Sequence, residues 1–341
     1  MTNKRLMEQT ENENVTKKRR RPRIKLEDVP ESVSSLESLI EIGKNIKFYR
    51  NIDTVMLWKI TPYLEELNNF IGMEKLKESV FYQVIYYLQG MHKRNQNEEY
   101  LHTIITGMPG AGKTSVAKII GKIYQSMDIL SKSGKFKIAY RDDFIAEYLG
   151  QTAVKTKKLL KSCIGGVLFI DEVYALGPGV GDKDSFSKEA LDTLNAFLSE
   201  HKNDFCCIAA GYEEDIKKCF FSMNKGLQRR FPWIHKIDEY DSGQLADIAF
   251  KMIDEMKWET ELSKDDMTEL LETNKEFFKF AGGDIETFLS KCKMSHAKRV
   301  LNKGWESKFV LNKEDMLDAI EMIKKYSIKN EKDDRPYGMY T

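Results

Sequence analysis

The chain has 341 residues, of which 41% are hydrophobic and 31% are charged, and its formal net charge at pH 7 is +1. This composition is typical of a folded globular protein of one or two domains, and it excludes a fibrous or wholly disordered chain. No run of apolar residues approaches the roughly 18 that a membrane helix needs, and the five cysteines form no C-x-x-C pair. We therefore expect an intracellular, cytoplasmic protein without a membrane span.

Residues 1–27 contain few apolar side chains and are predicted to be a disordered tail. Nine Lys or Arg and three Glu lie within residues 1–25, so the tail is basic although the whole chain is nearly neutral. The cluster from Lys17 to Lys25 indicates a nuclear import signal or an arm that binds nucleic acid. The alternative is a charged tail that interacts only with solvent.

The rest of the chain divides into segments by its hydrophobic pattern. Residues 28–66 show weak helical periodicity and are predicted to be a helical N-terminal extension. Residues 67–240 alternate buried strands with amphipathic helices, which predicts an α/β domain with a parallel five-stranded sheet and helices on both faces. Apolar stripes in residues 241–329 predict a small all-helical domain, and residues 330–341 are predicted to be a loosely held tail.

The pattern G-x-x-x-x-G-K-S/T is matched by the octapeptide Gly107-Met108-Pro109-Gly110-Ala111-Gly112-Lys113-Thr114. A predicted strand precedes it and a predicted helix begins at Ser115, so that backbone N–H groups of the loop and of Ser115 surround a phosphate chain. Lys113 is expected to reach the β- and γ-phosphates of ATP, and the Thr114 hydroxyl to bind Mg²⁺. The alternative, a glycine-rich turn without a ligand, is disfavoured by the strand and the helix on either side.

A turn at Ile71 and Gly72 leads into the helix that precedes this phosphate loop (P-loop). We expect these two residues to lie near the adenine of the bound nucleotide.

Two acidic residues, Asp171 and Glu172, directly follow the apolar strand of residues 167–170. Four consecutive apolar residues indicate a buried central strand, and ligands bind at the carboxyl ends of such strands. Asp171 is expected to hold Mg²⁺ through its water shell, and Glu172 to polarise a water for attack on the γ-phosphate. The alternative is a solvated strand end.

Arg229 and Arg230 lie on a predicted loop before the last strand of the sheet. A guanidinium is always ionised and binds phosphate oxygens in a fork, so it suits the charge that develops in the transition state of phosphoryl transfer. From an exposed loop it would act on the nucleotide of a neighbouring subunit, which requires a ring. The alternative is a basic pair on the surface.

Over residues 67–240 the chain resembles a known family in several further motifs. The motifs are Arg141-Asp142-Asp143, the stretch from Tyr148-Leu149-Gly150 to Thr156, the stretch from Gly165 to Tyr174, and Ala210-Gly211-Tyr212. The chain resembles the AAA+ ATPases of the CbbX/CfxQ type, which are the red-type Rubisco activase-like and SpoVK-like proteins. The resemblance implies a homo-hexamer with ATP between neighbours and a helical lid after the α/β domain. It also implies that Tyr148, Leu149 and Gly150 form a pore loop that grips a protein client.

Two places depart from the pattern of most AAA proteins. Gly211-Tyr212 stands at the strand end where a polar residue commonly senses the γ-phosphate. The family also places an arginine early in the third lid helix, whereas the stretch from Phe280 to Thr287 contains no Arg or Lys and the first is Lys291.

The leading hypothesis is a ring ATPase, with ATP and Mg²⁺ as cofactors, that remodels a protein client through its pore. A second hypothesis is a nucleotide-controlled assembly scaffold with weak hydrolysis, which the missing lid arginine favours. A third is an AAA+ factor that acts on nucleic acid, which the basic tail alone supports. A P-loop kinase is disfavoured because it needs no combination of Glu172, an arginine pair and a helical lid.

Overall fold

The computed structural model describes residues 25–45, 47–94, 100–131, 134–148, 150–177, 185–202, 204–302 and 308–333. Some of the predictions above fall outside these ranges. They concern the basic tail up to residue 24, Leu149 of the predicted pore loop, and the C-terminal tail from residue 334 onward.

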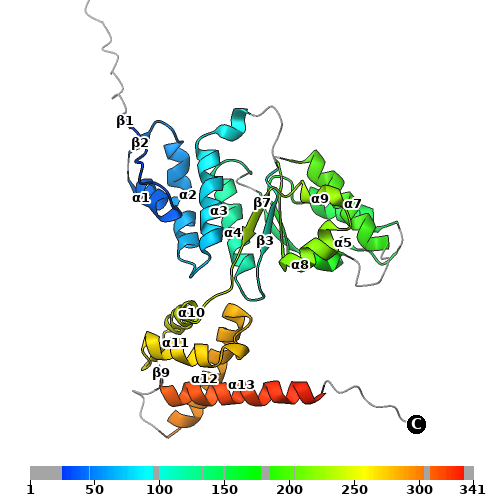
Figure 1. The fold of residues 1–341 in the computed structure, drawn as a ribbon. Coiled ribbons are helices and arrows are strands. Elements are labelled where there is room, and N and C mark those ends of the chain that lie inside the picture. Colours follow the sequence, from blue (N-terminus) through cyan, green and yellow to red (C-terminus); the bar gives the residue numbers. More distant parts are fainter. Residues whose placement is uncertain are drawn as a thin grey trace, which may run out of the picture.

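A parallel five-stranded sheet lies at the centre of the larger domain, with the strand order β4-β5-β6-β3-β7 (Figure 1). The strands are β3 (Thr103–Thr106), β4 (Phe136–Ala139), β5 (Val167–Ile170), β6 (Cys206–Gly211) and β7 (Trp233–Lys236). All residues of β3, β5 and β6 are buried, which is why these segments carry no charged side chain and no alternation of apolar with exposed polar residues. Because the strands are parallel, the segments that follow β3, β5 and β6 meet at one edge of the sheet.

Helices cover both faces of the sheet, which confirms the predicted fold class (Figure 1). One face is covered by α3 (Glu74–Leu88) and α4 (Lys113–Ser126). The other face is covered by α5 (Arg141–Phe144), α6 (Thr152–Lys161), η2 (Val173–Leu176), α7 (Ser185–Glu200), α8 (Glu213–Asp215), η3 (Ile216–Phe221) and α9 (Lys225–Gln228). Successive strand residues alternate between the faces, so Ile105 packs in the first core and Ile104 in the second. A short turn of helix, η1 (Met91–Arg94), follows α3.

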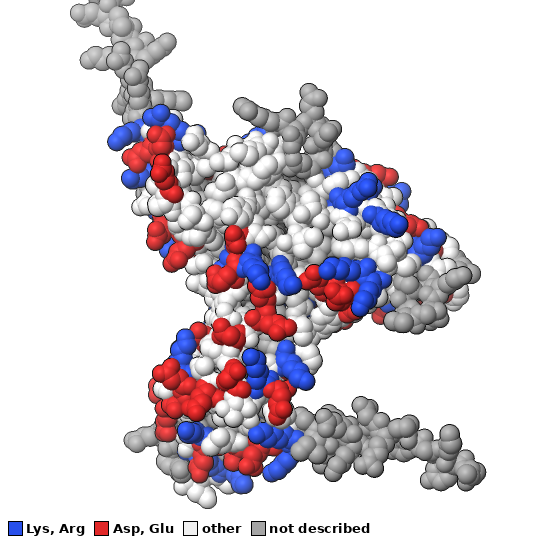
Figure 2. Space-filling model, viewed as in Figure 1, with Lys and Arg blue, Asp and Glu red and all other residues white. Residues whose placement is uncertain are grey.

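The C-terminal lid has a hydrophobic core of its own. It consists of α10 (Ser242–Glu255), α11 (Lys264–Thr273), η4 (Lys275–Phe277), α12 (Ala281–Val300) and α13 (Lys313–Asp333). On the face shown in Figure 2, acidic side chains gather where the lid meets the sheet domain.

The prediction of an all-helical lid is wrong in one detail. Two short segments, β8 (Glu259–Thr260) and β9 (Val310–Leu311), form a parallel pair. The segment β8 follows α10 and β9 precedes α13. Their pairing gives hydrogen-bond partners to backbone groups of the connections between the helices. The last helix also continues to Asp333, past the predicted end of the lid at residue 329.

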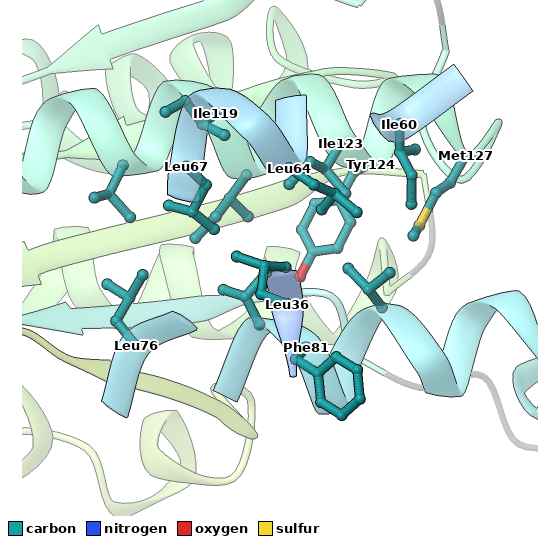
Figure 3. Packing of buried hydrophobic residues seen from close by; sticks show 14 of the residues in the cluster. Leu36, Ile60, Leu64, Leu67, Leu76, Phe81, Ile119, Ile123, Tyr124 and Met127 are labelled. Atoms are coloured by element: carbon teal, nitrogen blue, oxygen red, sulfur yellow. The ribbon is translucent and has the colours of Figure 1, made fainter. Parts of the chain in front are cut away.

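The N-terminal extension packs on α4 and α3 (Figure 3). It contains β1 (Leu26–Glu27), α1 (Leu36–Lys44), β2 (Phe48–Tyr49) and α2 (Thr54–Asn68). Side chains from α1 and α2 surround Tyr124 of α4, and the ion pair between Lys122 and Glu66 joins α4 to α2 at 2.9 Å. The strand β1 begins inside the predicted tail of residues 1–27, because Leu26 and Glu27 pair with β2.

Candidate functional site

The P-loop connects β3 to α4 in a conformation that only glycine adopts without strain. Gly110 and Gly112 have φ angles of +69° and +85°, and Gly112 directly precedes the first residue of α4. The N–H of Gly107 donates to the Gly211 carbonyl at 3.3 Å, which ties the loop to the end of β6. The loop therefore stands at the carboxyl edge of the sheet, with α4 starting from it.

The Lys113 side chain lies folded over this loop. Its ammonium group donates to the carbonyls of Gly107 at 3.1 Å and Met108 at 2.9 Å. Burial lowers the pKa of Lys113 from its ordinary value, and the charges of Asp171 and Glu172 oppose that shift. The cation is therefore already held where a phosphate chain would lie, by weak acceptors that phosphate oxygens can replace.

Thr114 and Asp171 come together although 57 positions separate them in the chain. The Thr114 hydroxyl donates to Asp171 Oδ2 at 3.4 Å, from the first turn of α4 to the end of β5. Hydroxyl and carboxylate oxygens are ligands that Mg²⁺ prefers. The two predicted metal ligands thus lie side by side, although β6 separates β5 from β3 in the sheet.

Glu172, which directly follows Asp171, has an unusual backbone conformation. Its backbone is left-handed, with φ +48°, and its N–H donates to Asp171 Oδ1 at 3.1 Å. A non-glycine residue in this region costs on the order of 1 kcal/mol, and such strain gathers at functional sites. The Glu172 side chain is exposed, and its charge acts on Lys113 at the same edge of the sheet.

The turn at Ile71 and Gly72 lies beside the end of the P-loop and against the lid. A Cβ on Gly72 would lie 3.0 Å from Gln244 Nε2 and 3.2 Å from the ring of Tyr240. Its neighbours Phe70 and Met73 reach the space next to Gly112. The predicted adenine-binding residues are therefore grouped with the P-loop and the first lid helix.

The first turn of α12 lies directly on the P-loop. A Cβ on Gly110 would come within 2.5 Å of the Phe280 carbonyl oxygen and 2.8 Å of the Gly283 nitrogen. Asp284 accepts a hydrogen bond from the Phe280 N–H at 2.6 Å and so caps this helix. The lid is closed over the phosphate loop.

Lysines that sequence analysis overlooked line the cleft between lid and P-loop. A cavity of about 310 Å³ is bounded by Met108 and Ala111 on one side and by Lys275, Phe278 and Lys279 of the lid on the other. Lys275 lies 3.8 Å from Glu272, whereas Lys279 makes no ion pair within the described part of the chain. Both lysines precede α12. From the sequence, a lid cation is expected on that helix, where the family places an arginine, and the two lysines are therefore missed. The signal that could have found them is a pair of lysines, four positions apart, just before the glycines that meet the P-loop.

Comparisons with known proteins agree with this geometry. Residues 103–232 match the family model described as ATPase family associated with various cellular activities (AAA). A putative cfxQ-like protein of Acanthamoeba polyphaga mimivirus is 39% identical over 306 residues, which cover 87% of this chain and 73% of the relative. Stage V sporulation protein K of Bacillus subtilis is 37% identical over 246 residues, which cover 70% of this chain and 75% of the relative.

The chain belongs to the CbbX/CfxQ-like AAA+ ATPases. It is therefore an ATPase that binds nucleotide. Among solved structures, a point mutant of Thermotoga maritima RuvB has a TM-score of 0.52 at 19% identity, covering 75% of this chain and 72% of that one, and shows the same fold. None of the helices within the described ranges is long and apolar enough to span a membrane.

The two arginines of this AAA+ ATPase differ in their surroundings. Arg230 donates from Nε to the Ser199 hydroxyl at 3.1 Å and from a terminal nitrogen to the Gly226 carbonyl at 2.8 Å. It therefore holds α9 against α7 within its own subunit. Arg229 is exposed, and in the described part of the chain it has no hydrogen-bonded partner for its side chain. Within the described residues, neither arginine makes a hydrogen bond or an ion pair with the P-loop.

The predicted pore loop lies between α5 and α6. The Tyr148 side chain is 67% exposed, and Gly150 has a φ of +80° in open space, where an added Cβ would meet no atom within 4 Å. The base of this segment is anchored, because Arg141 at the start of α5 donates to the carbonyls of Ala175 and Gly177 and to the Ser187 hydroxyl.

Proposed function

We propose that this AAA+ ATPase forms a homo-hexameric ring that hydrolyses ATP between neighbouring subunits and remodels a protein client through its central pore. The observation that carries the proposal is the anchoring by Arg141. Arg141 lies at the start of α5, which leads to the exposed Tyr148. Its hydrogen bonds join α5 to the segment that follows Glu172. A shift of the catalytic segment on hydrolysis can then move the client-binding loop.

In the proposed reaction Lys113 leaves the carbonyls of its own loop and binds the β- and γ-phosphates. Thr114 and Asp171 fit Mg²⁺ because their oxygens already lie 3.4 Å apart, and phosphate oxygens and water would complete its shell. When bound, Mg²⁺ neutralises the charge of the phosphate chain. Glu172 orients and polarises the attacking water, since its exposed carboxylate lies near Lys113.

Arg229 is proposed to complete the site of a neighbouring subunit, and Arg230 to hold the loop that carries it. The Arg230 guanidinium is already engaged with Ser199 and Gly226, which favours Arg229 as the residue that reaches out. A guanidinium supplied from another subunit stabilises the transition state in related chemistry.

A mixing experiment tests the shared site. Glu172→Gln and Arg229→Ala should each lower turnover at least about 100-fold, because each removes one half of every site. When equal amounts are mixed, roughly a quarter of the interfaces pair an intact Glu172 with an intact Arg229, so activity should return. The control is Lys225→Ala, which removes another exposed cation from α9 and should leave turnover unchanged. Without recovery on mixing, the proposal of a site completed in trans fails.

The client loop is tested separately with Tyr148→Ala. Basal ATP hydrolysis should stay within about twofold of wild type, since the Tyr148 side chain is 67% exposed and is not packed into the site. Stimulation of hydrolysis by a chemically unfolded polypeptide should be lost. Tyr140→Ala is the matched control, because Tyr140 is 58% exposed just before α5. Full stimulation of the Tyr148 variant would contradict the pore proposal.

A nucleotide-controlled scaffold remains the second candidate, because α12 carries no Arg or Lys before Lys291. Tight ATP binding with wild-type turnover as low as that of Glu172→Gln would favour it over the remodelling ATPase.

A further inference from the structure

Two tyrosines lie between the acidic pair and the P-loop. Tyr174 belongs to η2, and Tyr212 directly follows β6. Their ring centroids are 5.5 Å apart and the ring planes differ by 23°, which is a stacked arrangement. The Lys113 ammonium lies 5.4 Å from the centroid of the Tyr212 ring. The pair therefore reaches from the segment of Glu172 to the cation of the P-loop.

The phenol groups interact with Glu172 and with each other. The Tyr174 hydroxyl lies close to the Glu172 carboxylate and to the Tyr212 phenol, since both groups affect or share its electrostatic surroundings. Burial, and then the charge of Glu172, raise the pKa of both phenols above the ordinary value. Both tyrosines are therefore protonated at neutral pH, so Tyr174 has an O–H that it can donate.

The backbone leaves room for this stack at Gly211. A Cβ at this position would lie 2.9 Å and 3.2 Å from two carbons of the Tyr174 ring. The same residue accepts the hydrogen bond from Gly107, so the space for the ring and the tie to the P-loop depend on one glycine. A larger residue would displace the ring that contacts Tyr212.

We propose that the Tyr174–Tyr212 stack is a positioning element for ATP hydrolysis. Tyr174 orients the Glu172 carboxylate through its hydroxyl, and Tyr212 guides the Lys113 ammonium through the face of its ring. When phosphate draws Lys113 away from the carbonyls of Gly107 and Met108, the ring still limits where the ammonium lies. This inference rests on the proposed role of Glu172 in hydrolysis.

The test separates the hydroxyl from the ring. Tyr174→Phe removes the hydroxyl that lies near Glu172, Tyr212→Leu removes the Tyr212 ring, and Tyr212→Phe keeps that ring. Tyr174→Phe and Tyr212→Leu should each lower kcat about tenfold while the dissociation constant for ATP stays within about twofold. Tyr212→Phe should restore most of the kcat that Tyr212→Leu loses. ATP binding is measured by calorimetry and turnover by phosphate release.

The control is Tyr82→Phe, because Tyr82 is 60% exposed on α3 and its hydroxyl contacts only Glu78 among the described residues. Wild-type kcat in both Tyr174→Phe and Tyr212→Leu overturns the proposal. If these variants lose ATP affinity and kcat to the same extent, the proposal is also overturned, because that result indicates that the tyrosines only pack the site. Glu172→Gln is measured beside them: if it retains wild-type turnover, the proposed role of Glu172 fails, whatever the tyrosine variants do.

Discussion

At the scale of single residues, the site depends on backbone conformations that few side chains tolerate. Gly110 is left-handed and lies against the first turn of α12, and Glu172 is left-handed beside Asp171. The conformation of Gly110 lets the backbone of the P-loop approach that of α12, and the conformation of Glu172 lets its N–H donate to the Asp171 carboxylate. Both serve the proposed nucleotide site rather than the stability of the sheet.

Replacing Gly110 by alanine should open the contact between P-loop and lid. The new Cβ meets backbone atoms of Phe280 and Gly283 that cannot rotate away. We expect ATP affinity to fall about tenfold or more, measured by titration calorimetry. Gly90→Ala carries the same backbone strain, with φ +68°, but its nearest neighbour is the flexible end of Lys93 at 3.9 Å. Equal ATP affinity in the two variants would show that the lid contact has no part in binding.

Two buried histidines should make the fold sensitive to acid. Burial lowers the pKa of His102, directly before β3, and of His235 in β7 to about 4, from an ordinary value of 6.5. Both are therefore neutral in the folded state, and unfolding lets them take up protons below pH 6.5. Their contribution to stability is complete above pH 6.5 and is lost as the pH falls toward 4.

The variant His235→Gln tests this, since glutamine can still contact the Ser79 hydroxyl, which lies 2.9 Å from His235 Nδ1, but does not titrate. We expect the melting temperature of the variant to fall less steeply between pH 6.5 and 4 than that of the wild type. Parallel curves would contradict the assignment.

At the scale of elements, the extension and the lid cover the sheet domain in different ways. The helices α1 and α2 share one continuous core with α3, α4 and the sheet, whereas the lid has a core of its own and touches the P-loop through α12. We infer that the extension supports the P-loop helix and that the lid responds to the nucleotide.

The contribution of the extension can be measured on α2. Leu64 is fully buried against α4, so Leu64→Ala should lower the free energy of unfolding by about 2–5 kcal/mol. Val55 on the same helix is 49% exposed, and Val55→Ala should change it by less than about 0.5 kcal/mol. Chemical denaturation of both variants gives the comparison. Similar losses would mean that α2 is not part of the core.

The lid should supply a cation from the segment before α12. Lys279→Ala is expected to weaken ATP binding about fivefold, with a smaller effect at high salt, because Lys279 faces the cleft beside Met108 and Ala111. Lys275→Ala should have less effect, because Lys275 lies near Glu272. Affinities at two salt concentrations test both statements. Equal effects of the two substitutions would contradict a particular role for Lys279.

At the scale of the whole molecule, one described chain holds a nearly complete site and lacks one proposed part. Lys113, Thr114, Asp171 and Glu172 meet at one edge of the sheet, while Arg229 points to solvent elsewhere. If a neighbour supplies the missing cation, the specific ATPase activity should rise with protein concentration and then level off. Phosphate release measured across a dilution series checks this, with Glu172→Gln as the inactive baseline. A constant specific activity, in a chain that is monomeric by light scattering, would contradict the ring.

The sequence by itself determined the sheet domain, the P-loop and the acidic pair. These depend on local signals: the spacing of glycines before Lys113, and a short apolar run before Asp171 that only a buried strand explains. It also indicated a helical lid, but it missed the pairing of β8 with β9, because two-residue strands have no periodicity to detect.

Only the tertiary structure decided which side chains meet across the chain. It distinguished Arg229 from Arg230, stacked Tyr174 on Tyr212, and brought Lys279 to the P-loop. It also placed the weakly periodic extension in the main core. The physical reason is that these contacts join residues distant in sequence. Their geometry follows from the strand order and from the packing of the sheet domain and the lid, and no local sequence pattern encodes either of these.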